Sequence, residues 1–226
     1  TRVITPDIKM PGKSKLLYLD LGNGKNRLGG TALAQAYGQV GDESPDVADA
    51  ALLKRAFNAV QGLISKDLVL SGHDRSDGGL VTTLLEMAFS GNCGLEIRDE
   101  AAAEIPFLFS EELGLVVEYL PANEKRICAR LKKENVPHRV IGGTTTGKRI
   151  RVRIGGRRVL DEDMRVLRGI WEETSHRMEK LQANPVCASE EKKNIYDRPG
   201  PSYKVSFRPL TASPAPMKKR KHRVAI

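Results

Sequence analysis

The stretch SGHDRSDGGL, residues 71–80, holds two aspartates, Asp74 and Asp77, directly before Gly78 and Gly79. Apolar runs on both sides predict a strand that leads into the stretch and a helix that leads out of it. A glycine-rich turn between a strand and a helix points unpaired backbone N–H groups at one spot, where the helix dipole favours an anion. An aspartate before that turn can hold Mg²⁺, an ion that prefers oxygen ligands and bridges to substrate phosphates. The same residue types also make ordinary caps and turns, so the motif predicts a metal–nucleotide corner or a capped turn.

The rest of the sequence alternates between strand-like and helix-like patterns. Strands are expected at residues 15–21, 68–70, 94–97, 115–120, 140–141, 149–154 and 157–160, and helices at residues 31–37, 46–65, 80–89, 123–135 and 164–181. Gly155 and Gly156 predict a hairpin between the last two strands. From about residue 184 the many prolines leave no sustained period, which indicates an extended arm or linker. The predicted fold class is therefore α/β (α+β), with its core in roughly the first 180 residues.

The composition is typical of a globular protein, with 40% hydrophobic and 29% charged residues in a chain of 226. Its apolar runs are far shorter than the ~20 residues of a membrane-spanning helix, so we expect a cytoplasmic protein without a membrane partner. No signal peptide is visible at Thr1, and we expect a piece of a longer protein. Cys93, Cys128 and Cys187 lack CxxC spacing, which argues against a zinc site or a disulfide framework and fits a reducing compartment.

The net charge of +9 gathers largely in two basic segments. Between residues 148 and 158 basic and apolar residues alternate, as in a strand with one solvated basic face. Residues 218–223, KKRKHR, follow a proline- and alanine-rich stretch that resembles a linker. Basic runs of this kind occur in nuclear-localisation and nucleic-acid-binding segments, but no aromatic residues for base stacking are interleaved with them. Nucleic-acid binding is therefore not expected, although a basic interaction module stays open as an alternative function.

Four blocks of the sequence together resemble the large, single-chain phosphoribosylformylglycinamidine synthases, the glutamine-dependent amidotransferases of purine synthesis. The blocks are RLGGTALAQ (27–35), SGHDRSDGGLVTTLLEMAFSGNCGLEI (71–97), FSEELGLVVE (109–118) and WEETSHRMEKLQ (171–182). Their order and gaps make the resemblance specific. The pattern GHDxSDGGL alone points only to the wider superfamily of aminoimidazole ribonucleotide (AIR) synthetase, selenophosphate synthetase and thiamine-phosphate kinase.

The resemblance implies a place within an internally duplicated synthetase region. Residues 1–183 are similar to the C-terminal-type domain of its second half, an AIR-synthetase-like mixed sheet with packed helices. Residues 184–217 would form an extended connector, and residues 218–226 a basic linker with the truncated first strand of the glutaminase. The implied partners are the preceding synthetase domains and the following glutaminase of the same polypeptide. The segment itself is then expected to be inactive alone, with no catalytic residue of its own.

The resemblance also implies a structural nucleotide site that holds ADP with Mg²⁺. Asp74 matches the family's aspartate in the metal shell, and Ser76 matches a residue that touches the nucleotide. The other metal ligands would belong to a neighbouring domain, so the segment alone should bind Mg²⁺ poorly, because that ion needs several oxygens. The implied parent enzyme uses ATP to transfer ammonia from glutamine onto formylglycinamide ribonucleotide, which gives formylglycinamidine ribonucleotide.

Four further residues are weaker candidates for this site. Asp77 is expected to cap a helix rather than to bind a ligand. His73 is expected to be a hydrogen-bonded structural residue rather than an acid–base catalyst. Gly29 and Gly30 could cradle a phosphate, although a turn followed by a Thr31 cap fits their sequence better.

Glu111 and Glu112 are expected to be paired acids on a helix, in a capping or solvated role, because the sequence places no second titratable partner near them. Two alternatives to the amidotransferase remain open. One is a catalytic domain of another ATP-dependent kinase or synthetase of the superfamily. The other is the basic interaction module.

Overall fold

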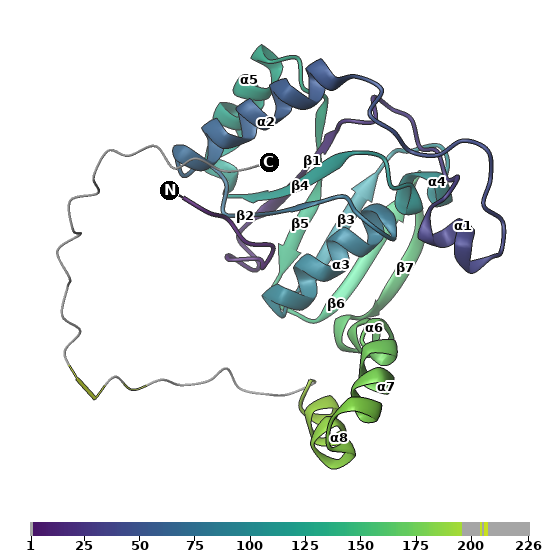
Figure 1. The fold of residues 1–226 in the computed structure, drawn as a ribbon. Helices are drawn as coiled ribbons and strands as arrows, with labels where there is room; N and C mark the ends of the chain where they lie inside the picture. The colour runs from purple at the N-terminus through teal and green to yellow at the C-terminus, as the bar shows by residue number, and fades with distance from the viewer. Residues whose placement is uncertain (1, 196–203, 205, 208–226) are drawn as a thin grey trace, which may run out of the picture.

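A computed structural model of the chain describes residues 2–195, 204, 206 and 207. Its centre is a mixed sheet with the strand order β2-β4-β1-β5-β3-β6-β7 (Figure 1). The strands are β1 (Lys15–Asp20), β2 (Ser71–Asp74), β3 (Gly94–Asp99), β4 (Gly114–Tyr119), β5 (His138–Thr145), β6 (Arg149–Ile154) and β7 (Arg157–Asp163). Neighbouring strands are antiparallel except β3 and β6, which pair in parallel. The predicted α/β (α+β) class is confirmed.

Helices lie on both faces of this sheet (Figure 1). One face packs against α3 (Gly79–Gly91) and α4 (Glu104–Phe109), and the other against α2 (Ala50–Ser65) and α5 (Glu124–Lys133). Two short elements lie in loops, α1 (Ala32–Ala36) and the 3-10 turn η1 (Pro121–Asn123). None of the helices among the described residues combines the length and the apolar character that a membrane crossing requires.

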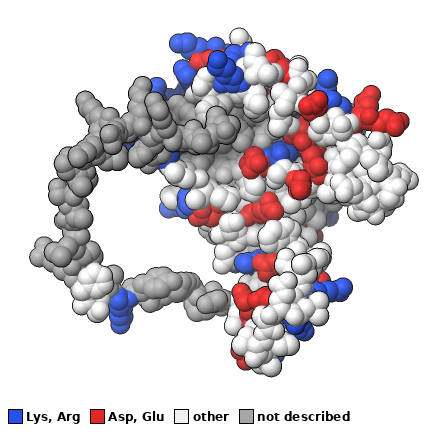
Figure 2. Space-filling model, in the orientation of Figure 1, with Lys and Arg blue, Asp and Glu red and all other residues white. Residues whose placement is uncertain are grey.

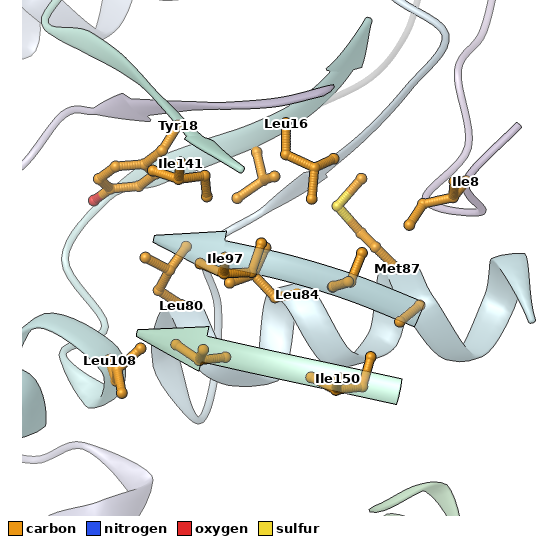
Figure 3. Packing of buried hydrophobic residues seen from close by; sticks show 14 of the residues in the cluster. Ile8, Leu16, Tyr18, Leu80, Leu84, Met87, Ile97, Leu108, Ile141 and Ile150 are labelled. Atoms are coloured by element: carbon orange, nitrogen blue, oxygen red, sulfur yellow. The ribbon is translucent and has the colours of Figure 1, made fainter. Parts of the chain in front are cut away.

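Strand β1 shows why both faces of the sheet need a cover. Successive side chains of a strand point to opposite faces, and here both sets are apolar. Leu16 and Tyr18 enter the cluster beneath α3, whereas Leu17 and Leu19 enter the cluster beneath α2 and α5. Figure 3 shows the first cluster, in which Met87 and other side chains of α3 lie against those of the strands. Each such buried side chain stabilises the fold by about 1.5–3 kcal/mol.

Strand β6 has the alternation that its sequence predicts. Ile150, Val152 and Ile154 are buried, and the arginines between them are exposed, so the predicted solvated basic face is confirmed. Gly155 and Gly156 turn the chain into β7 with φ angles of +53° and +77°, which L side chains rarely adopt. The predicted hairpin is therefore present.

Two predicted elements begin later than expected. The strand predicted at residues 68–70 starts at Ser71, so the motif itself pairs with β4. Short apolar runs show burial but do not show where a hydrogen-bonded ladder begins. The helix predicted from residue 46 starts at Ala50, because the Asp49 side chain accepts the N–H of Leu52 at 2.8 Å and caps it there.

The C-terminal helices are the main departure from prediction. Residues 164–181 form two helices, α6 (Met164–Trp171) and α7 (Glu173–Gln182), instead of one. A third helix, α8 (Pro185–Asn194), replaces the start of the predicted extended arm, so that prediction is wrong for these residues.

Helix α8 forms because its first residues are a good helix start. The Asn184 side chain accepts the N–H of Val186 at 2.9 Å, and Pro185 takes the first helical position, where no N–H is needed. The rest of the predicted connector, apart from residues 204, 206 and 207, lies outside the described residues, as does the basic tail 218–226.

Glu173 connects α7 to α8 through an ion pair with Lys192, and it also contacts Arg177. These cations, Lys192 first, lower the pKa of Glu173 from 4.5 to about 2. Because the folded-state pKa lies below the unfolded value, the contact stabilises α8 fully above pH 4.5 and is lost as the pH falls toward about 2. We expect the NMR shifts of α8 to move toward disordered values across this window. Glu173→Gln should remove that pH dependence, and an unchanged pH profile in the variant would contradict the assignment.

Candidate functional site

The turn between β2 and α3 is built on two glycines in the left-handed region. Gly78 has φ +82° and Gly79 has φ +75°. A Cβ at Gly79 would lie 2.6 Å from the carbonyl carbon of Phe109, so only glycine lets α3 approach the end of α4. Gly78 is the N-cap of α3, and no side chain caps this end. The predicted cap by Asp77 is therefore wrong, because the turn places this exposed residue one position too early.

Asp74 and Ser76, the predicted metal and nucleotide residues, are both exposed at this turn. The Asp74 side chain is 72% exposed, and its Oδ1 lies 3.0 Å from Nδ1 of His73. Its main-chain carbonyl accepts a hydrogen bond of 3.1 Å from the hydroxyl of Thr83 on α3. The backbone of the corner is thus fixed while the two predicted ligand side chains remain open to solvent.

Two hollows in the surface meet at His73. One, of about 530 Å³, lies between α3 and the α6–α7 helices and includes Ser76, Glu86 and Trp171 in its lining. The other, of about 390 Å³, lies between β2 and α2 and includes Asp74. The two predicted site residues therefore border different hollows, and His73 forms part of the wall of both.

The glycines of the first block already use their N–H groups. Gly29 and Gly30 donate to main-chain carbonyls of the loop at residues 40–43, each at 2.7 Å. The Thr31 hydroxyl accepts the N–H of Ala34 at 3.3 Å and caps α1, as predicted. A phosphate in this loop would have to displace two backbone hydrogen bonds, so the observed bonds favour the turn over the cradle.

Glu111 joins the two glycine-rich turns. Its Oε1 accepts the N–H of Ala32 at the start of α1 and the N–H of Gly78 at the start of α3, both at 2.8 Å. The spot to which these N–H groups point is therefore filled by a carboxylate of the chain itself. The prediction that Glu111 lies on a helix is wrong, since α4 ends at Phe109 and the residue lies in the following loop.

Glu112, in the same loop, is fully buried. Its two oxygens take a bidentate contact from Arg27, with 2.5 Å to Nε and 2.9 Å to the other guanidinium nitrogen. The hydrogen bonds to Glu112 raise the pKa of Arg27 above its ordinary value. The expectation of a solvated Glu112 is therefore wrong, because the loop turns this carboxylate inward to hold the segment that leads into α1.

Three of the sequence blocks thus meet at one corner. Glu111 and Glu112 of the third block bind the first block through Arg27 and Ala32, and bind the second through Gly78. Figure 2 shows acidic side chains across the middle of this face of the molecule.

Among the described residues no three His, Cys, Asp or Glu side chains are grouped so as to hold a metal ion. Asp74 would supply one oxygen of a shell that other groups must complete.

Arg75 also belongs to this corner, although no sequence pattern singles it out. It is only 4% exposed, and it donates to the Tyr18 hydroxyl at 2.7 Å and to the Phe107 carbonyl at 3.0 Å. Burial raises the pKa of Tyr18 above its ordinary value. The buried guanidinium therefore anchors the turn to β1 and α4 from below, next to the exposed Asp74.

The basic segment around β6 has acidic partners on the same face. Arg149 lies 2.5 Å from Asp161, and Arg151 lies 2.6 Å from Glu96. Ion pairs of this kind leave less free charge than the sequence suggests, so they weaken the alternative of a basic interaction module. The other basic run, residues 218–223, lies outside the described residues.

The cysteines differ in exposure, and this predicts their reactivity. Burial raises the pKa of Cys93 to about 11, whereas Cys187 is exposed on α8. Because the thiolate is the reactive form, we expect Ellman's reagent at about pH 8 to modify Cys187 rapidly and Cys93 only after unfolding. Mass spectrometry of the modified peptides checks this order. Equal rates for the two thiols in the folded chain would contradict it.

Comparison with known proteins agrees with this architecture. Residues 15–155 match the family described as AIR synthase related protein, C-terminal domain. The probable phosphoribosylformylglycinamidine synthase, chloroplastic/mitochondrial, of Arabidopsis thaliana is 44% identical over 216 residues, which are 94% of this chain and 15% of that protein. The phosphoribosylformylglycinamidine synthase of Homo sapiens is 44% identical over 209 residues, or 90% of this chain and 16% of that protein. The chain thus spans a small part of these relatives.

Solved structures share the fold. T. maritima PurL complexed with ATP has a TM-score of 0.59 at 18% identity, and the match covers 74% of this chain and 27% of that one. T. maritima PurL complexed with FGAR has a TM-score of 0.59 at 19% identity, over 73% of this chain and 29% of that one. At this identity the likeness concerns the fold alone. Since the family match includes every strand of the sheet from β1 to β6, the chain belongs to the family of AIR synthase related protein, C-terminal domain.

Proposed function

We propose that the chain is one segment of a phosphoribosylformylglycinamidine synthase. This ligase of purine biosynthesis would use ATP and glutamine to convert formylglycinamide ribonucleotide to formylglycinamidine ribonucleotide. The observation that carries the proposal is that relatives of this name match 90–100% of the chain at 38–44% identity. The chain spans 15–19% of their length, so the other synthetase domains and a glutaminase would be its partners within one polypeptide. The segment alone would be inactive.

Within that enzyme the segment would complete a nucleotide site rather than perform the reaction. Asp74 would give one carboxylate oxygen to Mg²⁺, and Ser76 a hydroxyl to ADP or ATP. Two observations support these roles: both side chains are exposed at one turn, and the backbone of that turn is held by Thr83 and Glu111. PurL structures have been solved with ATP, ADP and AMPPCP. When bound, Mg²⁺ neutralises phosphate charge.

The proposal is tested in the full-length enzyme with Asp74→Asn. The amide has the shape of the carboxylate but lacks its charge, so we expect the purified variant to lose its bound ADP and Mg²⁺. Because a ligand that binds only the folded state stabilises it, the variant should also unfold at a lower temperature. Asp67→Asn, at an exposed position before the start of β2, whose other end is Asp74, is the matched control. A variant that keeps ADP and Mg²⁺ at the level of the unmodified enzyme would contradict the role of Asp74.

The chain of 226 residues by itself tests whether it carries only part of the nucleotide site. One carboxylate is too few oxygens for Mg²⁺, so millimolar ADP with Mg²⁺ should leave its unfolding temperature unchanged. A clear upward shift would show that the segment carries a complete site.

The location is part of the proposal as well. We expect the full-length enzyme in the cytoplasm, although the Arabidopsis thaliana relative is named chloroplastic/mitochondrial. Microscopy of a C-terminally tagged full-length protein distinguishes these compartments. A signal confined to an organelle would overturn this part of the proposal.

A further inference from the structure

We infer that His73 and Glu86 form a positioning relay that orients the carboxylate of Asp74. This inference rests on the proposed function, in which Asp74 is a metal ligand, and adds two residues that act through it. His73 is the last residue but one of β2, and Glu86 lies on α3. The relay therefore runs from the helix through the imidazole to the end of the strand.

The imidazole of His73 lies between two carboxylates. Its Nδ1 is 3.0 Å from Oδ1 of Asp74, and its Nε2 is 3.0 Å from Oε2 of Glu86. The ring is only 18% exposed and Glu86 only 24%, whereas Asp74 is 72% exposed. The two inner members of the relay are thus held by the protein, and the outer member reaches solvent.

His73 is the side-chain partner that the described residues offer to the Asp74 carboxylate. An exposed aspartate without such a partner samples several rotamers, and a bound ion would have to select one of them. The contact with Nδ1 occupies Oδ1 and leaves Oδ2 open as the oxygen for an incoming cation. The hydrogen bond from Thr83 to the carbonyl of Asp74 fixes the backbone at the same residue, so side chain and main chain are both oriented from α3.

Groups that hold a ligand in place typically change metal affinity by about 10–100-fold when they are removed. If the contact between His73 and Glu86 only linked β2 to α3, the expected result would differ. Breaking it would lower the stability of the protein but would leave the affinity of the folded protein for the ion unchanged. Ion affinity in the folded state therefore separates a positioning role from a structural one.

The experiment uses the full-length enzyme and Mn²⁺ as the probe, with binding in the presence of ADP measured by electron paramagnetic resonance. His73→Phe keeps a ring but removes both nitrogens, and we expect about tenfold weaker Mn²⁺ binding. Glu86→Gln removes the charge that supports the ring from α3, and we expect a smaller loss of a few fold. His176→Phe, a partly buried histidine of α7, is the matched control and should bind Mn²⁺ as the unmodified enzyme does. Thermal unfolding without ligand identifies any variant that fails to fold.

The outcomes distinguish this inference from the function on which it rests. Suppose that folded His73→Phe binds Mn²⁺ as tightly as the unmodified enzyme, while Asp74→Asn binds it more weakly. This result would overturn the relay and leave the role of Asp74 standing. Unchanged binding in Asp74→Asn would overturn both. If His73→Phe does not fold, Glu86→Gln and His73→Asn take its place. The asparagine amide can still reach Asp74. We therefore expect the His73→Asn enzyme to bind Mn²⁺ more tightly than the His73→Ala enzyme. Equal affinities of these last two variants would also overturn the relay.

Discussion

We expect the replacement of Glu118 by alanine to lower the free energy of unfolding by about 4 kcal/mol, because it leaves several buried donors without an acceptor. The Glu118 carboxylate is fully buried on β4. It accepts the N–H groups of Lys9 and Met10 at 2.8 and 2.9 Å, and the hydroxyls of Ser14 and Ser71 at 2.6 and 2.8 Å. One side chain thus joins the N-terminal loop, β2 and β4.

Urea denaturation followed by circular dichroism measures this loss. Glu118→Gln tests the cause separately, since the amide keeps the volume but turns an NH₂ group toward donors. It should therefore also destabilise the chain, by less than alanine does. Glu190→Ala, at an exposed position of α8, is the control and should change stability by less than about 0.5 kcal/mol. A Glu118→Ala chain as stable as this control would show that the buried carboxylate is not needed by the fold.

Glu112→Gln should give the second largest effect, a loss of about 3 kcal/mol, because a buried carboxylate that holds an arginine is replaced by a neutral group. The variant loses the bidentate contact to Arg27, and with it the tie between the loop after α4 and the segment before α1. That segment contains the exposed Lys25, so a released loop should be cut by trypsin after Lys25 much faster than in the unmodified chain.

Two measurements together check this second prediction. Denaturation gives the global loss, and the initial rate of cleavage after Lys25 gives the local release of the loop. Glu191→Gln, at an exposed position of α8, serves as the control for both. A global loss without faster cleavage would mean that Glu112 stabilises the core but does not hold this loop.

Much of the fold follows from local signals in the sequence. The alternation of Ile150, Val152 and Ile154 with arginines indicates a strand with one buried face, and Gly155 with Gly156 indicates the hairpin that follows. Such signals are carried by the periodicity of neighbouring residues, so they need no knowledge of the tertiary structure.

The contacts that build the corner could not be predicted in this way. Gly78 and Ala32 are 33 and 79 residues away from the carboxylate of Glu111 that binds them both. Nothing in the residues around Glu111 distinguishes a carboxylate that accepts N–H groups from two distant turns from one on a solvated surface. The burial of Arg75 was missed for the same reason, because its partners Tyr18 and Phe107 come from other elements.

The helix α8 was missed for a different reason. Several prolines after residue 184 predict an irregular segment, yet Pro185 lies where its missing N–H costs nothing and follows an asparagine that caps the first turn. The position of a proline within an element, rather than its presence, decides its effect.

The carboxylate of Glu111 has a consequence for how the corner responds to its surroundings. It supplies the negative charge that the starts of α1 and α3 would otherwise take from a bound anion. The Glu111 carboxylate therefore neutralises the two turns without a bound anion. For the proposed nucleotide site, we therefore expect changes in cellular nucleotide concentration to alter how often it is filled, and we expect the corner to keep one shape whether or not a nucleotide is bound.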